Sequence, residues 1–195
     1  MLILVHLSQF ECMSVVTIVT GLPRSGTSLM MQILEKASLE ILTDGIRQKD
    51  NNNPEGYFEL DAVKGIVKDN SFLKSAKGKV VKIVAPLPIF IDKSLSYRVI
   101  FMRREIEEIL RSQEIMLNKD QQAERQKFAT IYETHIQKTH QFFISNNIPY
   151  LDIPFKELMQ NPEHELEKII AFLELGAVWQ DLASAVNPSL YRNKI

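Results

Sequence analysis

The chain has 195 residues, of which 45% are apolar and 24% charged, and its formal net charge is -1. This composition is ordinary for a globular domain and excludes the low-hydrophobicity signature of a disordered chain. The near-zero net charge excludes a global field that would favour nucleic acid or an anionic membrane. We therefore expect no nucleic-acid partner, and any anion site should be local.

The single cysteine, Cys12, excludes an internal disulfide framework and a cysteine-rich zinc site. No apolar run is long enough to span a bilayer, and the apolar opening 1–7 lacks the flanks of a signal peptide. We expect a cytoplasmic protein without a transmembrane segment, built as a single domain over 1–195, with 1–13 possible as a peripheral extension.

Short apolar strands alternate with amphipathic helices along the chain, without repeats or linkers. This alternation predicts an α/β fold in three αβα layers, with a central, mostly parallel sheet. The predicted strands cover 15–20, 79–85, 97–102 and 149–153, and the predicted helices cover 27–37, 105–117 and about 122–145. A further helix should begin at Asn161–Pro162, since asparagine caps helices and proline suits the first helical position.

The strongest local motif is GLPRSGTS, residues 21–28, which follows the first predicted strand and opens the first predicted helix. Gly21 and Gly26 permit a tight turn whose N–H groups point inward, and the helix N-terminus favours an anion. The loop has the GxxxxG spacing of a nucleotide triphosphatase, but Thr27 stands where that motif requires lysine. Only Asp152 is a candidate to hold magnesium at a strand end, so ATP hydrolysis is disfavoured.

A second basic motif lies in YRVIFMRREIEEILRS, residues 97–112. Arg104 closes a predicted strand, and Ser112 follows eight residues later, so the two side chains can face the same side of a helix. Arginine grips phosphate through a planar fork, and serine adds a neutral donor. The two motifs together predict two anion cradles, held a nucleoside's length apart.

The two motifs resemble those of the sulfotransferase family, whose members have a P-loop fold, and in particular those of its small bacterial members. The resemblance implies that Pro23, Arg24, Ser25, Gly26, Thr27 and Ser28 bind the 5'-phosphosulfate of 3'-phosphoadenosine 5'-phosphosulfate (PAPS). It assigns Arg104 and Ser112 to the 3'-phosphate, and makes adenosine 3',5'-bisphosphate the product. Three further segments resemble the corresponding parts of bacterial family members: NPEGYFE (53–59), 148–175 and VNPSLYRNK (186–194). The resemblance therefore covers about 15–194.

Sulfuryl transfer needs in-line positioning and stabilisation of the leaving group, which Arg24 and the helix N-terminus could supply without a metal. A general base is also expected. Cytosolic relatives carry a histidine that is absent from KIVAPLP (82–88), so we favour Glu59, with Glu55 and Asp61 behind it. Lys82 is similar to a family lysine near the sulfate, although a lysine at a strand edge is as easily solvated.

Three alternatives stay open at this point. The loop could be a structural strand-to-helix turn, the chain could be a P-loop kinase or nucleotidase with a degenerate lysine, or it could bind a nucleotide without catalysis. The acceptor could be a small molecule, a saccharide or a lipid, and an oligomer is possible. Cradles on opposite sides of the sheet, or an Arg104 buried against a carboxylate, would argue against PAPS.

Overall fold

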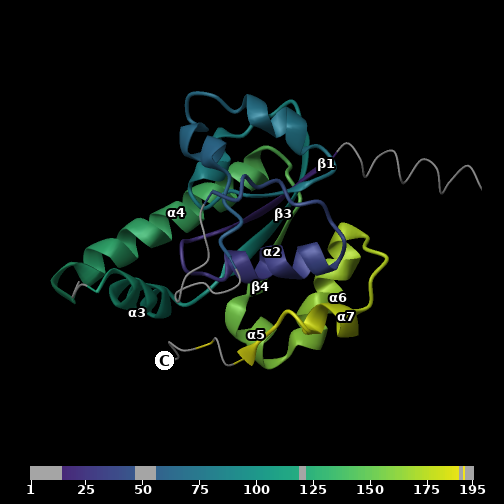
Figure 1. Cartoon of the computed structure of the whole chain (residues 1–195). Helices are drawn as coiled ribbons and strands as arrows, with labels where there is room; N and C mark the ends of the chain where they lie inside the picture. The colour runs from purple at the N-terminus through teal and green to yellow at the C-terminus, as the bar shows by residue number, and fades with distance from the viewer. Residues whose placement is uncertain (1–14, 47–55, 119–121, 189–190, 192–195) are drawn as a thin grey trace, which may run out of the picture.

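The computed structural model describes residues 15–46, 56–118, 122–188 and 191, so the extension 1–13 lies outside the described residues. A four-stranded sheet forms the centre (Figure 1), and its strands lie in the order β2-β1-β3-β4. The strands are β1 (Val15–Gly21), β2 (Val80–Lys82), β3 (Ser96–Arg103) and β4 (Tyr150–Pro154). All pairs are parallel, which confirms the expected parallel sheet.

The two central strands, β1 and β3, are covered on both faces. They pair in register from Val15 opposite Ser96 to Gly21 opposite Met102. Successive side chains of a strand point to opposite faces. Accordingly Ile100 packs into one core cluster and Phe101 into the other, and both are fully buried. A strand covered on both faces has no polar side, which is why these segments read as continuous apolar runs.

Helices form the two outer layers (Figure 1). One core cluster joins the sheet to α2 (Thr27–Lys36), α5 (Phe155–Gln160), α6 (Pro162–Leu173) and α7 (Trp179–Ala183). The other joins it to α3 (Ile106–Leu117), α4 (Arg125–Ser145) and the short 3-10 turns η1 (Asp61–Gly65), η2 (Ser71–Ala76) and η3 (Leu87–Phe90). A fourth turn, η4 (Gln122–Glu124), precedes α4. This is the expected three-layer α/β arrangement.

One strand is shorter than predicted, and one helix begins where predicted but lacks the expected capping hydrogen bond. The strand predicted over 79–85 is regular only at Val80–Lys82. The chain nevertheless stays beside β1, because the Ile83 N–H donates to the Val19 carbonyl (3.0 Å) and the Ala85 N–H to the Gly21 carbonyl (2.9 Å). Asn161 occupies the N-cap of α6 ahead of Pro162, but its side chain makes no capping hydrogen bond.

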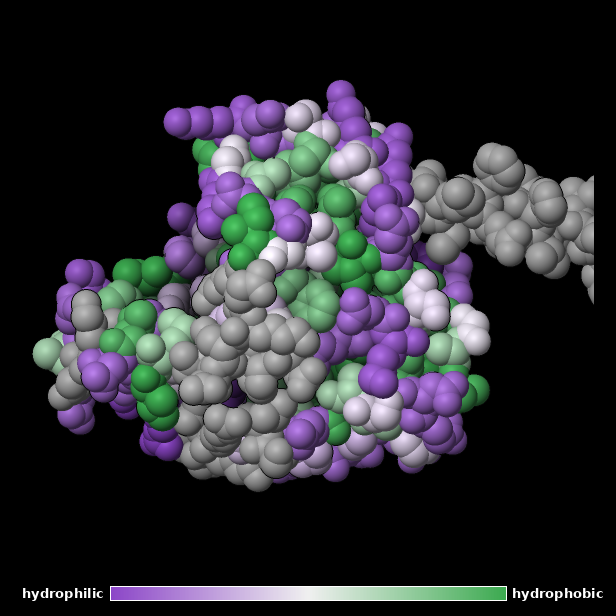
Figure 2. Space-filling model, in the orientation of Figure 1, coloured by the Kyte–Doolittle hydropathy of each residue, from purple (hydrophilic) through white to green (hydrophobic). Residues whose placement is uncertain are grey.

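The surface matches the balanced charge of the sequence. On the face seen in Figure 2, hydrophilic and hydrophobic residues are interspersed rather than separated into two regions. Within the described part of the chain, no helix combines the length and the apolar character needed to cross a membrane.

The order of the strands decides where a ligand can bind. β1 lies between β2 and β3, and the chain leaves the carboxyl ends of β1 and β3 toward α2 and α3 on opposite faces of the sheet. Parallel α/β sheets bind ligands in the crevice that such a divergence opens at the carboxyl ends of the strands. Both basic motifs of the sequence lie at this edge.

Candidate functional site

The loop after β1 has the backbone that its glycines predicted. Gly26, the N-cap of α2, adopts φ 100°, and Arg24 adopts φ 69°. A Cβ at Gly26 would lie 2.4 Å from Phe155 Cδ2, and a Cβ at Gly21 would lie 2.6 Å from the Met102 carbonyl oxygen. Both positions therefore require glycine, since each combines a positive φ with the close approach of neighbouring chain.

Ser25 gives this loop an unsatisfied polar group. The residue is fully buried, and its hydroxyl Oγ has no hydrogen-bond partner among the described residues. A buried hydroxyl without a partner costs about 1–3 kcal/mol. An anion held against the start of α2, where N–H groups and the helix dipole favour negative charge, could satisfy it. Residues 21–28 therefore fit a phosphate or sulfate group.

Lys82 brings a positive charge to the same loop from β2. Its side chain is buried, with 6% of the residue exposed, so the solvated alternative for this lysine is wrong. The ammonium group donates to the Tyr57 carbonyl and lies 3.5 Å from Ser28 Oγ. The loop thus has a cation beside it although Thr27 replaces the usual lysine.

The second basic motif touches the first directly. The Arg24 Nε–H donates to Ser112 Oγ (3.0 Å), and the Arg104 Nη1–H donates to the Arg24 carbonyl (3.0 Å). Both motifs therefore meet at the carboxyl end of the sheet, although α2 and α3 cover its opposite faces. The Arg24 side chain reaches from the loop to α3 and so links the two motifs.

Arg104 is held by a carboxylate. Its side chain is 8% exposed, and its Nε–H donates to Glu108 Oε2 (2.8 Å), one turn along α3. The other oxygen of Glu108 accepts the hydroxyl of Tyr191 (2.6 Å). The guanidinium also lies over the rings of Phe155 (4.6 Å) and Tyr191 (5.5 Å). This burial against a carboxylate is the arrangement that counts against a phosphate role for Arg104.

Sequence reasoning missed the residues around Arg104. The spacing of Arg104 and Glu108, four residues apart in a helical segment, is a signal that could have found Glu108. Tyr191 belongs to the tail segment that resembled the family, but no local pattern places its hydroxyl 83 positions back along the chain.

A small pocket brings the proposed base close to Lys82. It has a volume of about 190 Å³, and Glu59 and Lys82 both line it, together with Asp44, Asp61 and Lys64. Asp61 pairs with Lys64 (2.6 Å). Hydrogen bonds from the N–H groups of Ile46 and Asp61 lower the pKa of Asp44. Glu55 lies outside the described residues.

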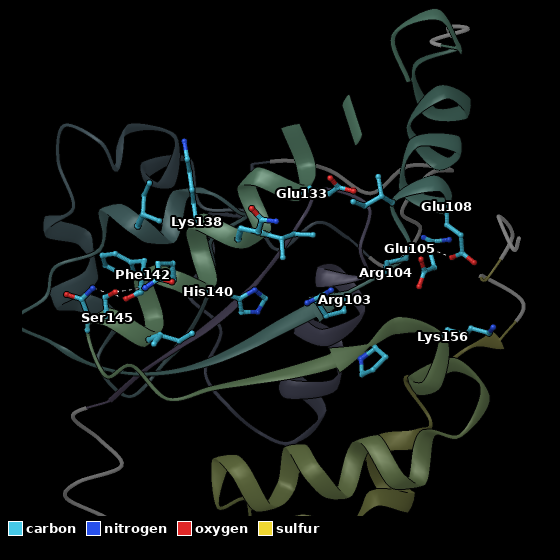
Figure 3. A pocket seen from close by; sticks show the side chains of 18 residues that line it. Arg103, Arg104, Glu105, Glu108, Glu133, Lys138, His140, Phe142, Ser145 and Lys156 are labelled. Atoms are coloured by element: carbon cyan, nitrogen blue, oxygen red, sulfur yellow. Dashed lines mark hydrogen bonds and ion pairs between the residues drawn. The ribbon is translucent and has the colours of Figure 1, made fainter. Parts of the chain in front are cut away.

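A larger cavity, about 1240 Å³, reaches from Arg104 and Glu108 along α4 (Figure 3). His140 lies on its wall, stacks on Phe101 with ring centroids 4.3 Å apart and bonds Asp152 through Nε2 (2.9 Å). Asp152, the one candidate for magnesium, is therefore engaged by His140. Among the described residues no group of three His, Cys, Asp or Glu side chains could hold a metal ion.

No family model matches the chain, and no curated protein matches it in sequence. Solved structures do match. The sulfotransferase domain of the Synechococcus PCC 7002 olefin synthase superposes with a TM-score of 0.53 at 13% identity, over 90% of this chain and 85% of that domain. Sulfotransferase STF9 from Mycobacterium avium gives a TM-score of 0.53 at 10% identity, over 94% and 70%.

Retinol dehydratase, solved in a complex with retinol and PAP, gives a TM-score of 0.51 at 13% identity. The match covers 88% of this chain and 64% of retinol dehydratase, slightly less than two thirds of its length. These similarities show that the chain has a sulfotransferase-type α/β fold, as its two motifs suggested.

Proposed function

We propose that this chain, which has a sulfotransferase-type fold, is an enzyme that transfers a sulfuryl group from PAPS to a hydroxyl or amine acceptor. The observation that carries the proposal is the loop over residues 21–28, with the buried Lys82 beside it and a buried Ser25 hydroxyl that no described residue hydrogen-bonds. This loop offers N–H groups, a hydroxyl and a cation to one anion.

The donor would be held in two places. The 5'-phosphosulfate would lie against residues 23–28, where Arg24, Thr27 and Ser28 add donors to the loop. The 3'-phosphate would lie near Arg104, which follows β3, and Ser112, which lies in α3. Both residues contact Arg24. The presence of PAP in the retinol dehydratase structure supports a nucleotide of this kind.

The proposed transfer is a displacement at sulfur. The acceptor oxygen or nitrogen forms a bond to sulfur while the bond between sulfur and the bridging oxygen of the nucleotide breaks, which releases adenosine 3',5'-bisphosphate. Glu59 would take the proton of the acceptor in the small pocket, which Lys82 also lines. Lys82 and Arg24 would stabilise the negative charge that develops on the bridging oxygen. The acceptor itself is a small molecule in this proposal.

One measurement separates this function from its alternatives. A ligand at one hundred times its dissociation constant stabilises the native state by about 2.7 kcal/mol. We expect the melting temperature to rise with adenosine 3',5'-bisphosphate and hardly at all with ATP and magnesium. Equal shifts with both ligands would overturn the donor assignment in favour of a kinase or nucleotidase. Binding of the bisphosphate without turnover of PAPS on any acceptor would indicate a non-catalytic nucleotide-binding protein.

A further inference from the structure

We infer that Tyr191 and Glu108 are positioning residues, which orient Arg104 toward the 3'-phosphate of the donor nucleotide. The inference rests on the proposed function, because it assumes that a nucleotide with a 3'-phosphate binds at this edge of the sheet. It concerns the carboxylate that otherwise argues against that role, and it gives the chain's tail a part in recognising the donor.

The guanidinium of Arg104 is fixed at two points of its planar fork. Nε–H donates to Glu108 Oε2 (2.8 Å), and Nη1–H donates to the Arg24 carbonyl (3.0 Å). Arginine has five N–H donors in a rigid geometry. Two of them are used here, and within the described ranges no acceptor meets the other three. The fork is thus oriented while keeping donors for a phosphate.

The carboxylate of Glu108 is itself held in place by the tail. Its Oε1 accepts the Tyr191 hydroxyl (2.6 Å), and Glu108 is almost fully buried. Burial, and then the hydrogen bond and charge of Glu108, raise the pKa of Tyr191 to about 12, so the hydroxyl keeps its proton and remains the donor. The two oxygens of Glu108 thus join Arg104, which precedes α3, to Tyr191 of the tail.

The aromatic rings complete the support. Phe155 and Tyr191 meet edge to face, with centroids 5.2 Å apart, and both lie within cation–π distance of Arg104. Phe155 also packs against Gly26 of the phosphate loop. The orientation of Arg104 is thereby coupled to the loop on one side and to the tail on the other.

Charge does not forbid an anion here. Three cations, Arg24, Lys82 and Arg104, converge on this edge of the sheet, where Glu108 pairs with Arg104. A group of three cations favours a bound anion. The competing explanation is that Glu108 neutralises Arg104 so completely that the site ignores a 3'-phosphate, and the two explanations predict opposite effects of removing its charge.

The test compares the dissociation constants of adenosine 3',5'-bisphosphate and adenosine 5'-phosphate by titration calorimetry. We expect the wild-type protein to prefer the bisphosphate. Tyr191→Phe, which removes one hydroxyl and keeps the ring, should reduce that preference roughly fivefold, the effect of one net hydrogen bond, with little change for the monophosphate. Glu108→Gln should also reduce it, because the amide NH2 of glutamine would face one of the two groups that donate to Glu108.

Tyr132→Phe is the matched control, since the Tyr132 hydroxyl donates to Gln113, and neither residue contacts Arg104. It should leave the preference unchanged. A preference that survives Tyr191→Phe, or that increases in Glu108→Gln, would overturn the inference while leaving the proposed function standing. A wild-type protein that binds neither nucleotide would instead remove the proposed function, and the inference with it.

Discussion

The side chain of Lys82, on β2, places a positive charge beside the phosphate loop, residues 21–28. In a nucleotide triphosphatase the lysine comes from the loop itself, at the position of Thr27 here. Lys82 reaches the loop because β2 pairs with β1 and places Lys82 opposite Val19, near the end of the strand that leads into the loop. The Lys82 ammonium lies 3.5 Å from Ser28 Oγ, so its positive charge is close to the start of α2.

Glu59→Gln tests the proposed base. The substitution keeps the shape and polarity of the side chain but removes its ability to accept a proton. We expect sulfuryl transfer to fall about 10²–10⁴-fold, the usual contribution of general base catalysis, while the affinity for adenosine 3',5'-bisphosphate stays unchanged. Steady-state rates and titration calorimetry provide the two measurements.

Asp69→Asn serves as a control for Glu59→Gln, because Asp69 is an exposed carboxylate that accepts hydrogen bonds from Ser71 and does not line the pocket. It should retain the full rate. An unchanged rate in Glu59→Gln would assign proton transfer to another group or to water.

At the scale of elements, the phosphate loop depends on the contact between Gly26 and α5. Gly26→Ala would force a side chain into φ 100° and bring its Cβ to 2.4 Å from the Phe155 ring. Backbone strain of this kind costs about 1–3 kcal/mol before any steric clash is added. We expect the urea unfolding midpoint to fall by an amount equivalent to at least about 2 kcal/mol.

Gly65→Ala is the matched control, since a Cβ there meets nothing within 4 Å. It should leave the midpoint within about 0.5 kcal/mol of wild type. Equal midpoints for both variants would show that the loop relaxes around a side chain at position 26.

The long elements could be predicted from the sequence because their periodicity is strong. β1 and β3 are continuous apolar runs, and α3, α4 and α6 repeat buried residues at helical spacing, as predicted. The 3-10 turns η1 to η3 could not be predicted, since four to six residues do not establish a period. The predicted strand over 79–85 extends beyond β2 for a different reason. The apolar segment continues beside β1, and its hydrogen bonds to β1 persist after the regular strand ends.

The candidate site was predictable only in part. Its loop and Arg104–Ser112 spacing are local patterns, and local patterns survive in a single sequence. The hydrogen bond from Arg24 to Ser112 and that from Tyr191 to Glu108 join residues about 80 or more positions apart. Only the folded arrangement creates such partners, so the sequence indicated the residues but not their engagement with one another.

At the scale of the whole molecule, buried tyrosines predict loss of stability at high pH. Burial, and then the charge of Asp92, raise the pKa of Tyr97 well above its usual value of 10. Burial also raises the pKa of Tyr132. A raised folded-state pKa means that the contribution to stability is complete below pH 10, and that it is lost as the pH rises from there through the folded-state value.

Tyr97→Phe isolates one of these groups. Between pH 9 and pH 11 we expect the free energy of unfolding of the wild type to fall more than that of the variant, by about 1 kcal/mol. Urea titrations at both pH values measure the difference. The variant also loses the hydrogen bond from the Tyr97 hydroxyl to the Asp92 carbonyl, but that loss is the same at both pH values. Equal pH dependence would mean that Tyr97 ionises freely in the folded protein.

The seven-residue pairing of β1 with β3 fixes the spacing of the two basic motifs independently of the chain between the strands. Adjacent strands lie about 4.8 Å apart whatever the chain does between them. The distance between the Gly21 end and the Met102 end is therefore independent of how many residues connect the two strands. Lengthening or shortening the connection, for example within 66–78, would leave the two basic motifs at their present spacing. The segment between the strands can therefore vary without moving the candidate anion site.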